Sequence, residues 1–267
     1  MQHFVITRLQ HLVFALFTVF ICTKALADDY LTHPWNTPLF SFEKSARFTN
    51  IKNGDVIETP YLIKFGLTGI GIAAIDKPLA QTGHHHLLID RPLPSDFRQP
   101  LPFNDQYIHF GKGQMETVIN LPPGEHTIRL VFADHRHIPN FVYSAPVKIT
   151  VSQQNKQLDP QSLLQKKVEI LEPVNGSKLS APFRISMHAS GWKISHEAIN
   201  NPETGHFQLI ITPRNGKEQV LDFHDGRTEV WLTPPPGEYV AVVNLISNQN
   251  GSVLASSIKS SFTITAR

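Results

Sequence analysis

Histidine is the residue type in this chain whose spacing most clearly points to chemistry. A run of three histidines begins at His84, two more flank Arg136, and His109 stands between these groups. Residues two positions apart on a strand point to the same face, so each group offers a pair of neighbouring imidazoles. Neutral imidazole is a ligand for zinc, copper, nickel and iron, so convergence of these rings predicts a transition-metal site. The predicted ligands are His84, His86, His109, His135 and His137.

Five polar residues near the predicted ligands are candidates for orienting the ligand rings. Such residues hydrogen-bond to the ring nitrogen that faces away from the metal. The candidates are His85, Asp90, Gln114, Glu116 and Asp134. His85 alternates onto the face of Leu87 and Ile89, so a buried, hydrogen-bonded position is its other interpretation. For the whole cluster, the competing hypothesis is a hydrogen-bonded network that braces loops.

The elements that must position these histidines occur twice. Thr82-Gly83-His84 recurs as Thr204-Gly205-His206, at an offset of 122 positions. Pro122-Pro123-Gly124-Glu125 recurs as Pro235-Pro236-Gly237-Glu238, at an offset of 113. The smaller offset fits a longer Pro-rich loop, from Asp90 to Gln106, in the first copy. The chain therefore contains two copies of one domain.

Each copy has the pattern of an all-β sandwich. Short runs alternate between apolar and polar residues, as half-buried strands do, and turns rich in Pro and Gly separate them. In each copy a long apolar strand follows the Pro-Pro-Gly-Glu turn, which resembles the tyrosine corner of immunoglobulin and fibronectin type III domains. The residues with a structural role in this corner are Gly124 and His126 in the first copy, and Gly237 and Tyr239 in the second.

The predicted fold is therefore two tandem immunoglobulin- or fibronectin-III-like β-sandwiches after a cleaved signal peptide. The aromatic residues of the N-terminal arm, Trp35, Phe40, Phe42 and Phe48, are expected to pack on a domain. The predicted parts are a signal peptide at 1–27, an N-terminal arm at 28–48, a His-rich domain at 49–152, a linker at 153–167 and a degenerate repeat at 168–267.

Assigning the strands of the first copy to the positions of an immunoglobulin-type sandwich, lettered A to G, predicts that the histidines lie together. Strand C begins at His84, the D–E loop holds His109, and strand F ends at His135 and His137. The loops concerned lie at one end of such a sandwich, so three clusters that are distant in sequence are expected to meet.

The second copy serves as an internal control. It has Phe207 and Gln208 in place of His85 and His86, and Asp222 in place of His109. The fold therefore does not require these histidines, which favours a functional role in the first copy. His188, His196, His206 and His224 of the second copy could build a different, weaker site, although they lack the i, i+2 pairing.

The first 27 residues predict export. Arg8 precedes an apolar run from Leu12 to Cys22, which is shorter than the roughly 20 residues that span a bilayer. Ala25-Leu26-Ala27 then forms a small-x-small cleavage signature, so we expect cleavage after Ala27 and a periplasmic or secreted protein. An uncleaved membrane anchor is the alternative. The mature form is expected to contain no transmembrane segment.

Charge and cysteine content limit the function classes. Cleavage would remove Arg8 and Lys24 and no acid, which brings the 24 basic residues down to the number of acidic ones, 22. Without a basic excess, nucleic acid is not an expected partner. The only cysteine, Cys22, would also be removed. A site without thiolate favours copper(II) or zinc(II) over copper(I).

Four strings in the first copy resemble a bacterial family described as domain of unknown function 4399. They are Gly83–Asp90, His109–Gln114, Pro122–Thr127 and Ala133–Pro139, and the resemblance covers about residues 56–152. The second copy resembles the family as a degenerate repeat. The resemblance implies an exported protein and leaves the activity open.

Two function classes follow from these observations. The favoured one is a binding protein that holds copper(II) or zinc(II) through the loop-end histidines of the first domain. The alternative is a cell-envelope module that binds a protein or a glycan, with the histidines as a structural network. An enzyme is disfavoured, because no Ser, Thr or Cys motif accompanies the histidines as a nucleophile. A metal-dependent hydrolase or oxidase stays open as an alternative, since a metal ion with one open coordination position can activate water.

Overall fold

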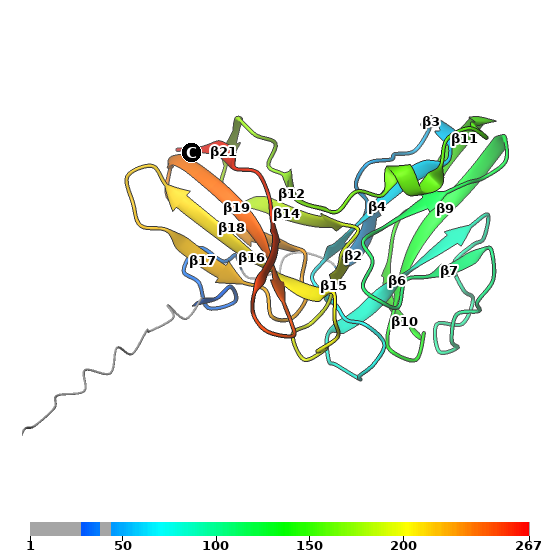
Figure 1. Ribbon diagram of the computed structural model, residues 1–267, viewed down its shortest axis with the longest axis horizontal. Helices are drawn as coiled ribbons and strands as arrows, with labels where there is room; N and C mark the ends of the chain where they lie inside the picture. The colour runs from blue at the N-terminus through cyan, green and yellow to red at the C-terminus, as the bar shows by residue number, and fades with distance from the viewer. Residues whose placement is uncertain (1–27, 38–43, 267) are drawn as a thin grey trace, which may run out of the picture.

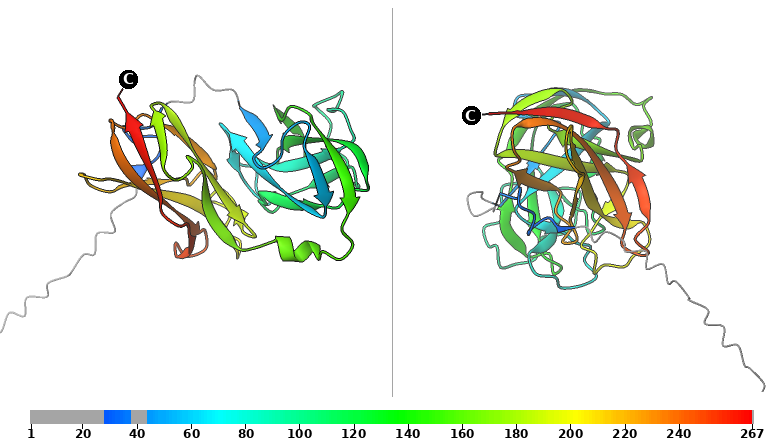
Figure 2. Two further views of the ribbon diagram at one scale, coloured as in Figure 1. Left: turned by 90° about the horizontal axis from the view of Figure 1, so that it is seen from above. Right: turned by 90° about the vertical axis from the view of Figure 1, so that its left-hand side faces the viewer.

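Alternating runs bounded by Pro and Gly fold as strands along the described chain, which covers residues 28–37 and 44–266 of the computed structural model (Figure 1). The strands form two β-sandwiches that lie side by side, joined by a connection with one short 3-10 helix, Pro160–Leu163 (Figure 2). The predicted all-β class with two sandwiches is confirmed. The predicted signal peptide, Phe40 and Phe42 lie outside the described residues. Within the described part, no helix has the length and apolar character of a membrane span.

The first sandwich packs a three-stranded sheet, ordered β2-β4-β8, against a seven-stranded one. The larger sheet has the order β3-β11-β9-β6-β5, with β7 added at β6 and β10 at β9. The strands are β2 (Ser45–Phe48), β3 (Val56–Thr59), β4 (Tyr61–Thr68), β5 (Gly71–Ile72), β6 (Thr82–Ile89), β7 (Tyr107–His109), β8 (Glu116–Ile119), β9 (Gly124–Ala133), β10 (Pro139–Tyr143) and β11 (Val147–Gln154). The first sheet thus begins at Ser45, inside the predicted arm.

The second sandwich repeats this arrangement strand for strand. Its small sheet has the order β12-β14-β18, and its large sheet has the order β1-β17-β16-β19-β21-β13 with β15 and β20 added. The strands are β12 (Lys167–Glu172), β13 (Ser177–Ser180), β14 (Phe183–Ser190), β15 (Lys193–Ile194), β16 (Thr204–Pro213), β17 (Gln219–Asp222), β18 (Glu229–Leu232), β19 (Gly237–Ser247), β20 (Val253–Ser256) and β21 (Ser260–Thr265). Only β1 (Asp28–Asp29) has no counterpart among the described strands of the first sandwich.

The N-terminal arm docks on the second sandwich, although it precedes the first in the chain. Strand β1 pairs in parallel with β17. Tyr30 stacks on Phe223 with ring centroids 4.6 Å apart, and Trp35 meets the edge of Tyr239 at 5.8 Å. Arm and second sandwich therefore share one apolar core.

The corner turns hold the same position in both copies. The Tyr239 hydroxyl donates to the carbonyl of Pro235 at 2.6 Å, four residues back. His126 Nε2 stands 2.9 Å from the carbonyl of Pro122, also four residues back. An imidazole thus makes the corner hydrogen bond that a phenol makes in the other copy, as the lettering of the strands predicts.

A long loop covers the outer face of the first large sheet. Residues 90–106 supply Leu101, which packs on Leu88, Val131 and Ala133 of β6 and β9. The Leu101 amide also donates to the carbonyl of His137 at 2.9 Å. All eight residues of β6 are consequently buried, on both faces of the sheet. This loop accounts for the extra length of the first copy.

The two sandwiches meet through a reciprocal pair of backbone contacts. The Ile194 amide donates to the Gly113 carbonyl at 2.9 Å, and the Ile72 amide donates to the Gly226 carbonyl at 2.9 Å. A Cβ at Gly113 would lie 1.9 Å from the Ile194 carbonyl oxygen, and one at Gly226 would lie 2.1 Å from that of Ile72. Gly113 and Gly226 are repeat equivalents, so the interface resembles the self-complementary contact of a symmetric dimer.

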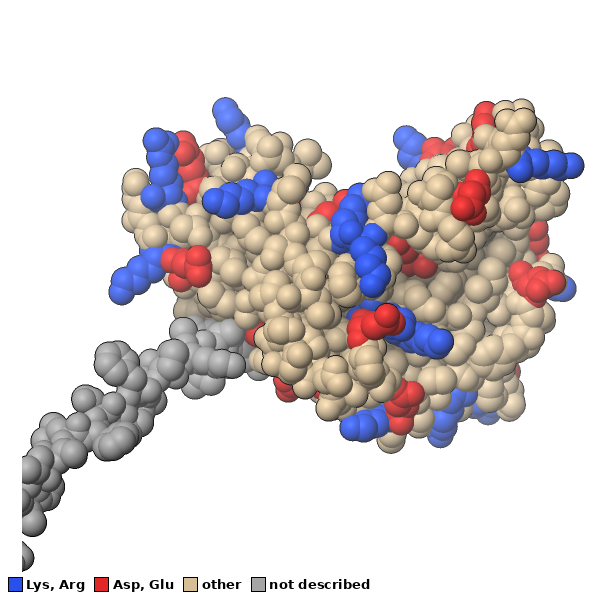
Figure 3. Space-filling view, in the orientation of Figure 1, with Lys and Arg blue, Asp and Glu red and all other residues tan. Residues whose placement is uncertain are grey.

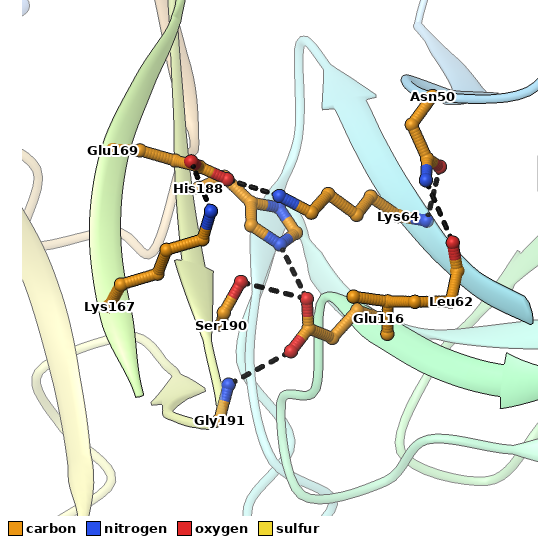
Figure 4. A network of polar contacts seen from close by, with 9 residues as sticks. All are labelled: Asn50, Leu62, Lys64, Glu116, Lys167, Glu169, His188, Ser190 and Gly191. Atoms are coloured by element: carbon orange, nitrogen blue, oxygen red, sulfur yellow. Dashed lines mark hydrogen bonds and ion pairs between the residues drawn. The ribbon is translucent and has the colours of Figure 1, made fainter. Parts of the chain in front are cut away.

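A buried polar network completes this interface (Figure 4). One carboxylate oxygen of Glu116 accepts from Ser190 Oγ at 2.9 Å and from His188 Nε2 at 3.1 Å. The other accepts from the Gly191 amide at 3.0 Å. Figure 3 shows the two lobes with a notch between them, and charges of both signs interspersed over that face.

Candidate metal centre

Four histidine side chains converge beneath the long loop of the first sandwich. One ligand atom from each of His84, His86, His109 and His137 lies within 4.8 Å of those of the others. The Nε2 atoms of His84 and His86 are 2.9 Å apart, and Nδ1 of His137 is 3.3 Å from Nε2 of His84. Four nitrogens bound to one zinc ion at ~2.0–2.1 Å stand about 3.3 Å from one another, and the separations from His84 to His86 and to His137 are close to this value.

Three elements supply the four rings. His84 and His86 share the outer face of β6, as residues two apart on a strand must. His109 is the last residue of β7, directly opposite His86 in the antiparallel register. The D–E loop assignment for His109 is therefore wrong: an extra edge strand holds it. His137 lies in the turn after β9 with φ of 66°, a left-handed conformation that histidine adopts more readily than most residues.

Burial keeps these imidazoles neutral. It lowers the pKa of His84 to about 2, and repulsion from the neighbouring imidazoles of His86 and His109 is the next largest cause. Burial lowers the pKa of His86 to about 3, and charge repulsion from His109 and His137 contributes next. The pKa values of His109 and His137 are lowered as well, first by burial. Neutral imidazole is the form that binds metals, so the set needs no deprotonation at neutral pH.

A glycine and an aromatic ring shape the site. A Cβ at Gly111 would lie 2.3 Å from Cε1 of His109, so the imidazole occupies space that only glycine leaves open. Phe103, from the long loop, meets the edges of His137 and His109 with ring centroids 4.7 and 5.1 Å apart. The signals for these two residues in the sequence are the glycines that follow His109 and the extra length of the loop between Asp90 and Gln106.

His135 does not join the cluster. Strand β9 ends at Ala133, and the carboxylate of Asp134 accepts from the amides of Arg136 and Ile138 to cap a turn. The alternation that would pair His135 with His137 requires a strand and does not hold in this turn. His135 instead lines a separate hollow of about 440 Å³ together with Lys44, and Asp134 orients the turn rather than a ligand ring.

The other predicted ring-orienting residues lie elsewhere. Asp90 binds His126 Nδ1 at 2.8 Å and the Thr127 amide at 2.7 Å, and so braces the corner. Gln114 accepts from the amide of Lys112 within its own loop. Glu116 bridges to the second sandwich (Figure 4). These side chains are committed to turns and to the interface, which their positions in the sequence did not reveal.

His85 points to the opposite face of β6, into the core. Its ring lies against Phe65 and Phe132, with centroids 5.2 and 5.1 Å away. Neither ring nitrogen has a hydrogen-bond partner among the described residues. Nδ1 of His84 and of His86 is likewise unpartnered there. His85 is therefore neither a ligand nor a residue that orients one.

Comparison with protein families identifies the chain. The model of the family described as domain of unknown function (DUF4399) matches residues 63–152 and, a second time, residues 185–267. The chain belongs to the DUF4399 family. All four histidines of the cluster fall in the first DUF4399 segment, and the second segment contains the equivalent strands. No curated protein matches this DUF4399 chain.

The solved structures that match this DUF4399 protein do so at low sequence identity and low TM-score. The fibronectin(III)-like modules of Clostridium thermocellum CbhA are 13% identical, over 83% of this chain and 94% of theirs, with a TM-score of 0.24. A two-domain fibronectin type III segment of chicken tenascin is 11% identical, over 84% and 98%, with a TM-score of 0.23. Latent PorU from Porphyromonas gingivalis is 13% identical, over 84% and 20%, with a TM-score of 0.29.

Proposed function

We propose that this protein is an exported binding protein that holds a copper(II) or zinc(II) ion in the first sandwich. The observation that carries the proposal is the convergence of four imidazoles, within 4.8 Å of one another, from two strands and a turn. The ligands are His84, His86, His109 and His137. Buffering, delivery or structural use of the ion are all consistent with such a centre.

The donor set favours these two ions. Four neutral imidazoles offer nitrogen ligands of intermediate softness, which suit zinc and copper, and no carboxylate of the kind that magnesium or calcium requires. Two of the four rings, His84 and His86, are completely buried on a strand, so they need little ordering when the metal binds. Preorganised ligands of this kind raise affinity.

Binding is proposed rather than catalysis. Zinc sites with four protein ligands are closed, whereas catalytic zinc sites keep one position for water or substrate. The ring of Phe103 lies against two of the four histidines and shields them on the loop side. Both features support retention of the ion rather than turnover of a substrate.

A pair of variants on one turn tests the ligand assignment. We expect His137→Ala to weaken zinc and copper affinity at least about tenfold, which is about 1.4 kcal/mol. His135→Ala, two residues away, is the matched control and should leave affinity unchanged, since His135 lies outside the cluster. The measurement is a competition titration of the untagged protein against a chelator. Equal affinity in both variants, or loss in the His135 variant alone, would refute the proposed ligand set.

Two exposed aromatic residues, Phe141 and Tyr143, with the half-buried Phe97 beside them, favour the second candidate, an envelope module that binds a protein or a glycan. Phe97 and Phe141 stack with centroids 4.7 Å apart and rings 10° from parallel, and Tyr143 lies 6.0 Å from Phe97. Phe141 is 71% exposed. Exposed aromatic faces are common anchors in recognition surfaces.

This second candidate is tested by the double variant Phe97→Ala/Phe141→Ala. If the surface is a recognition site, the variant should lose an envelope partner that the metal-free wild-type protein recovers by affinity capture. Capture that is unaffected by the variant, or that depends on the histidines instead, would contradict it.

A further inference from the structure

The second sandwich carries its own group of metal-type ligands. One ligand atom from each of His206, Asp222 and His224 lies within 4.8 Å of those of the others. Nε2 of His206 is 3.0 Å from Oδ1 of Asp222, and Nδ1 of His224 is 3.6 Å from the same oxygen. We propose that this group is a second binding site, for a divalent transition-metal ion held by two imidazoles and a carboxylate.

The hydrogen bonds of Asn248 orient His206 for this role. The amide nitrogen of Asn248 donates to the carbonyls of Ser195, His196 and Ile199, which identifies Oδ1 as the acceptor atom. That oxygen lies 2.7 Å from Nδ1 of His206, so Nδ1 must carry the proton. Although burial opposes it, the contacts with Asp222 and Asn248 raise the pKa of His206, so a metal ion would displace the proton on Nε2. Deprotonated Nε2 then presents its lone pair toward Asp222 Oδ1, 3.0 Å away. Ligand histidines in metal sites are typically fixed in this way by a hydrogen bond to the other nitrogen.

Asp222 turns a buried carboxylate oxygen toward the two imidazoles. Oδ1 lies 3.0 Å from Nε2 of His206, with which it forms an ion pair, and 3.6 Å from Nδ1 of His224. Oδ2 accepts from Gln208 Nε2 at 3.3 Å, which fixes the carboxylate. A metal ion bound here would replace the contact between Oδ1 and His206.

The repeat places this group where the first sandwich has its four histidines. His206 is equivalent to His84, and Asp222, which stands opposite Gln208, is equivalent to His109, which stands opposite His86. His224 is equivalent to Gly111, where a Cβ would collide with the ring of His109. The shorter Asp222 leaves that space open, and the imidazole of His224 fills it. The two copies thus supply ligands to the same region from different positions.

The donor set predicts a different ion preference from that of the first site. Two imidazoles and one carboxylate are a harder, negatively charged set, which binds iron(II), manganese(II) or zinc(II) with positions left open. Glu197 Oε2 lies 2.8 Å from Nδ1 of His224 and offers a second carboxylate. His224 and Glu197 are 43% and 52% exposed, so the open positions face solvent.

Zinc titration of the untagged protein tests the second site independently of the first. In the His84→Ala/His86→Ala background we expect one equivalent of zinc to bind, and His224→Ala added to that background to abolish it. His196→Ala is the matched control, because His196 lies in the same domain outside the cluster. Thermal unfolding of the metal-free variants checks the fold, which the half-exposed His224 side chain should not affect.

The outcomes separate the two sites. Binding of two equivalents of zinc to the wild-type protein, and of one to the His84→Ala/His86→Ala variant, supports both metal sites. One equivalent in each protein, lost with His224→Ala, keeps the second site and overturns the first. No zinc binding in the His84/His86 background, or binding that survives His224→Ala, would reduce the second cluster to an ion pair and overturn the proposal.

Discussion

His85 lies in the apolar interior between Phe65 and Phe132 with both ring nitrogens unpartnered among the described residues, and burial lowers its pKa to about 3. It is therefore neutral in the folded protein at neutral pH. In the unfolded chain its pKa is about 6.5. The unfolded state thus binds more protons between these values, and the free energy of unfolding falls as the pH drops below about 6.5.

His85→Phe should remove this contribution. Phe207 occupies the equivalent position in the second copy. Between pH 7 and pH 5, the metal-free wild-type protein should lose about 2 kcal/mol more stability than the variant. Urea unfolding at the two pH values measures the difference, and each protein serves as its own reference, so a change in packing does not matter. An identical pH dependence would mean that His85 is protonated in the folded protein as readily as in the unfolded chain.

Gly111→Ala probes the shape of the metal centre from one residue. The new Cβ would lie 2.4 Å from Nε2 of His109, so the imidazole must shift while the backbone stays. We expect metal affinity to fall by about 10- to 100-fold, as for other changes that misplace a ligand ring, with metal-free thermal unfolding unaltered. Chelator competition gives the affinity. Wild-type affinity in this variant would show that His109 is not a ligand.

Among the elements, the long loop over β6 determines how enclosed the first site is. Phe103→Ala should speed transfer of the bound metal to a chelator, because the ring no longer shields His109 and His137 from water. Phe97→Ala changes the same loop at a ring that stacks on Phe141 instead, and should leave the transfer rate as in the wild-type protein. Stopped-flow chelation compares the three proteins. Equal rates would rule out a shielding role for the loop.

The elements themselves are largely predictable, because the signals are local. Alternation and the Pro-Pro-Gly-Glu turns predict β9, β19 and their corners, including the exchange of Tyr239 for His126. The prediction that His135 pairs with His137 is wrong because the strand ends at Ala133, four residues before His137. The roles of Glu116 and Asp90 depend on partners from distant parts of the chain, which no local pattern encodes.

At the scale of the whole molecule, the repeat predicts two equivalent sandwiches but not how they pack. That packing depends on Gly113 and Gly226, each of which lies against the backbone of the other sandwich. Position-by-position comparison of the copies does not predict the second cluster, because His224 enters it from a position that is Gly111 in the first copy.

Gly113→Ala should separate the two sandwiches. The substitution places a Cβ 1.9 Å from the Ile194 carbonyl oxygen, at a φ of 85°. Gly54→Ala is the matched control, because its φ is 88° and nothing lies within 4 Å of its Cβ. In the control, the free energy of unfolding should fall only by the cost of a left-handed backbone at alanine, about 1–2 kcal/mol. In Gly113→Ala, the free energy of unfolding should fall further, and small-angle scattering should give a larger radius of gyration than for the control. Equal losses and equal radii would mean that the interface does not depend on this contact.

The most direct test of the central claim is X-ray absorption at the zinc edge of the His224→Ala variant loaded with one equivalent of zinc. This variant lacks the second cluster, so the spectrum reports on the first site alone. The account predicts four nitrogen neighbours at ~2.0–2.1 Å with the outer-shell scattering of imidazole rings. A shell dominated by oxygen, or fewer than three imidazoles, would contradict a metal centre built from His84, His86, His109 and His137.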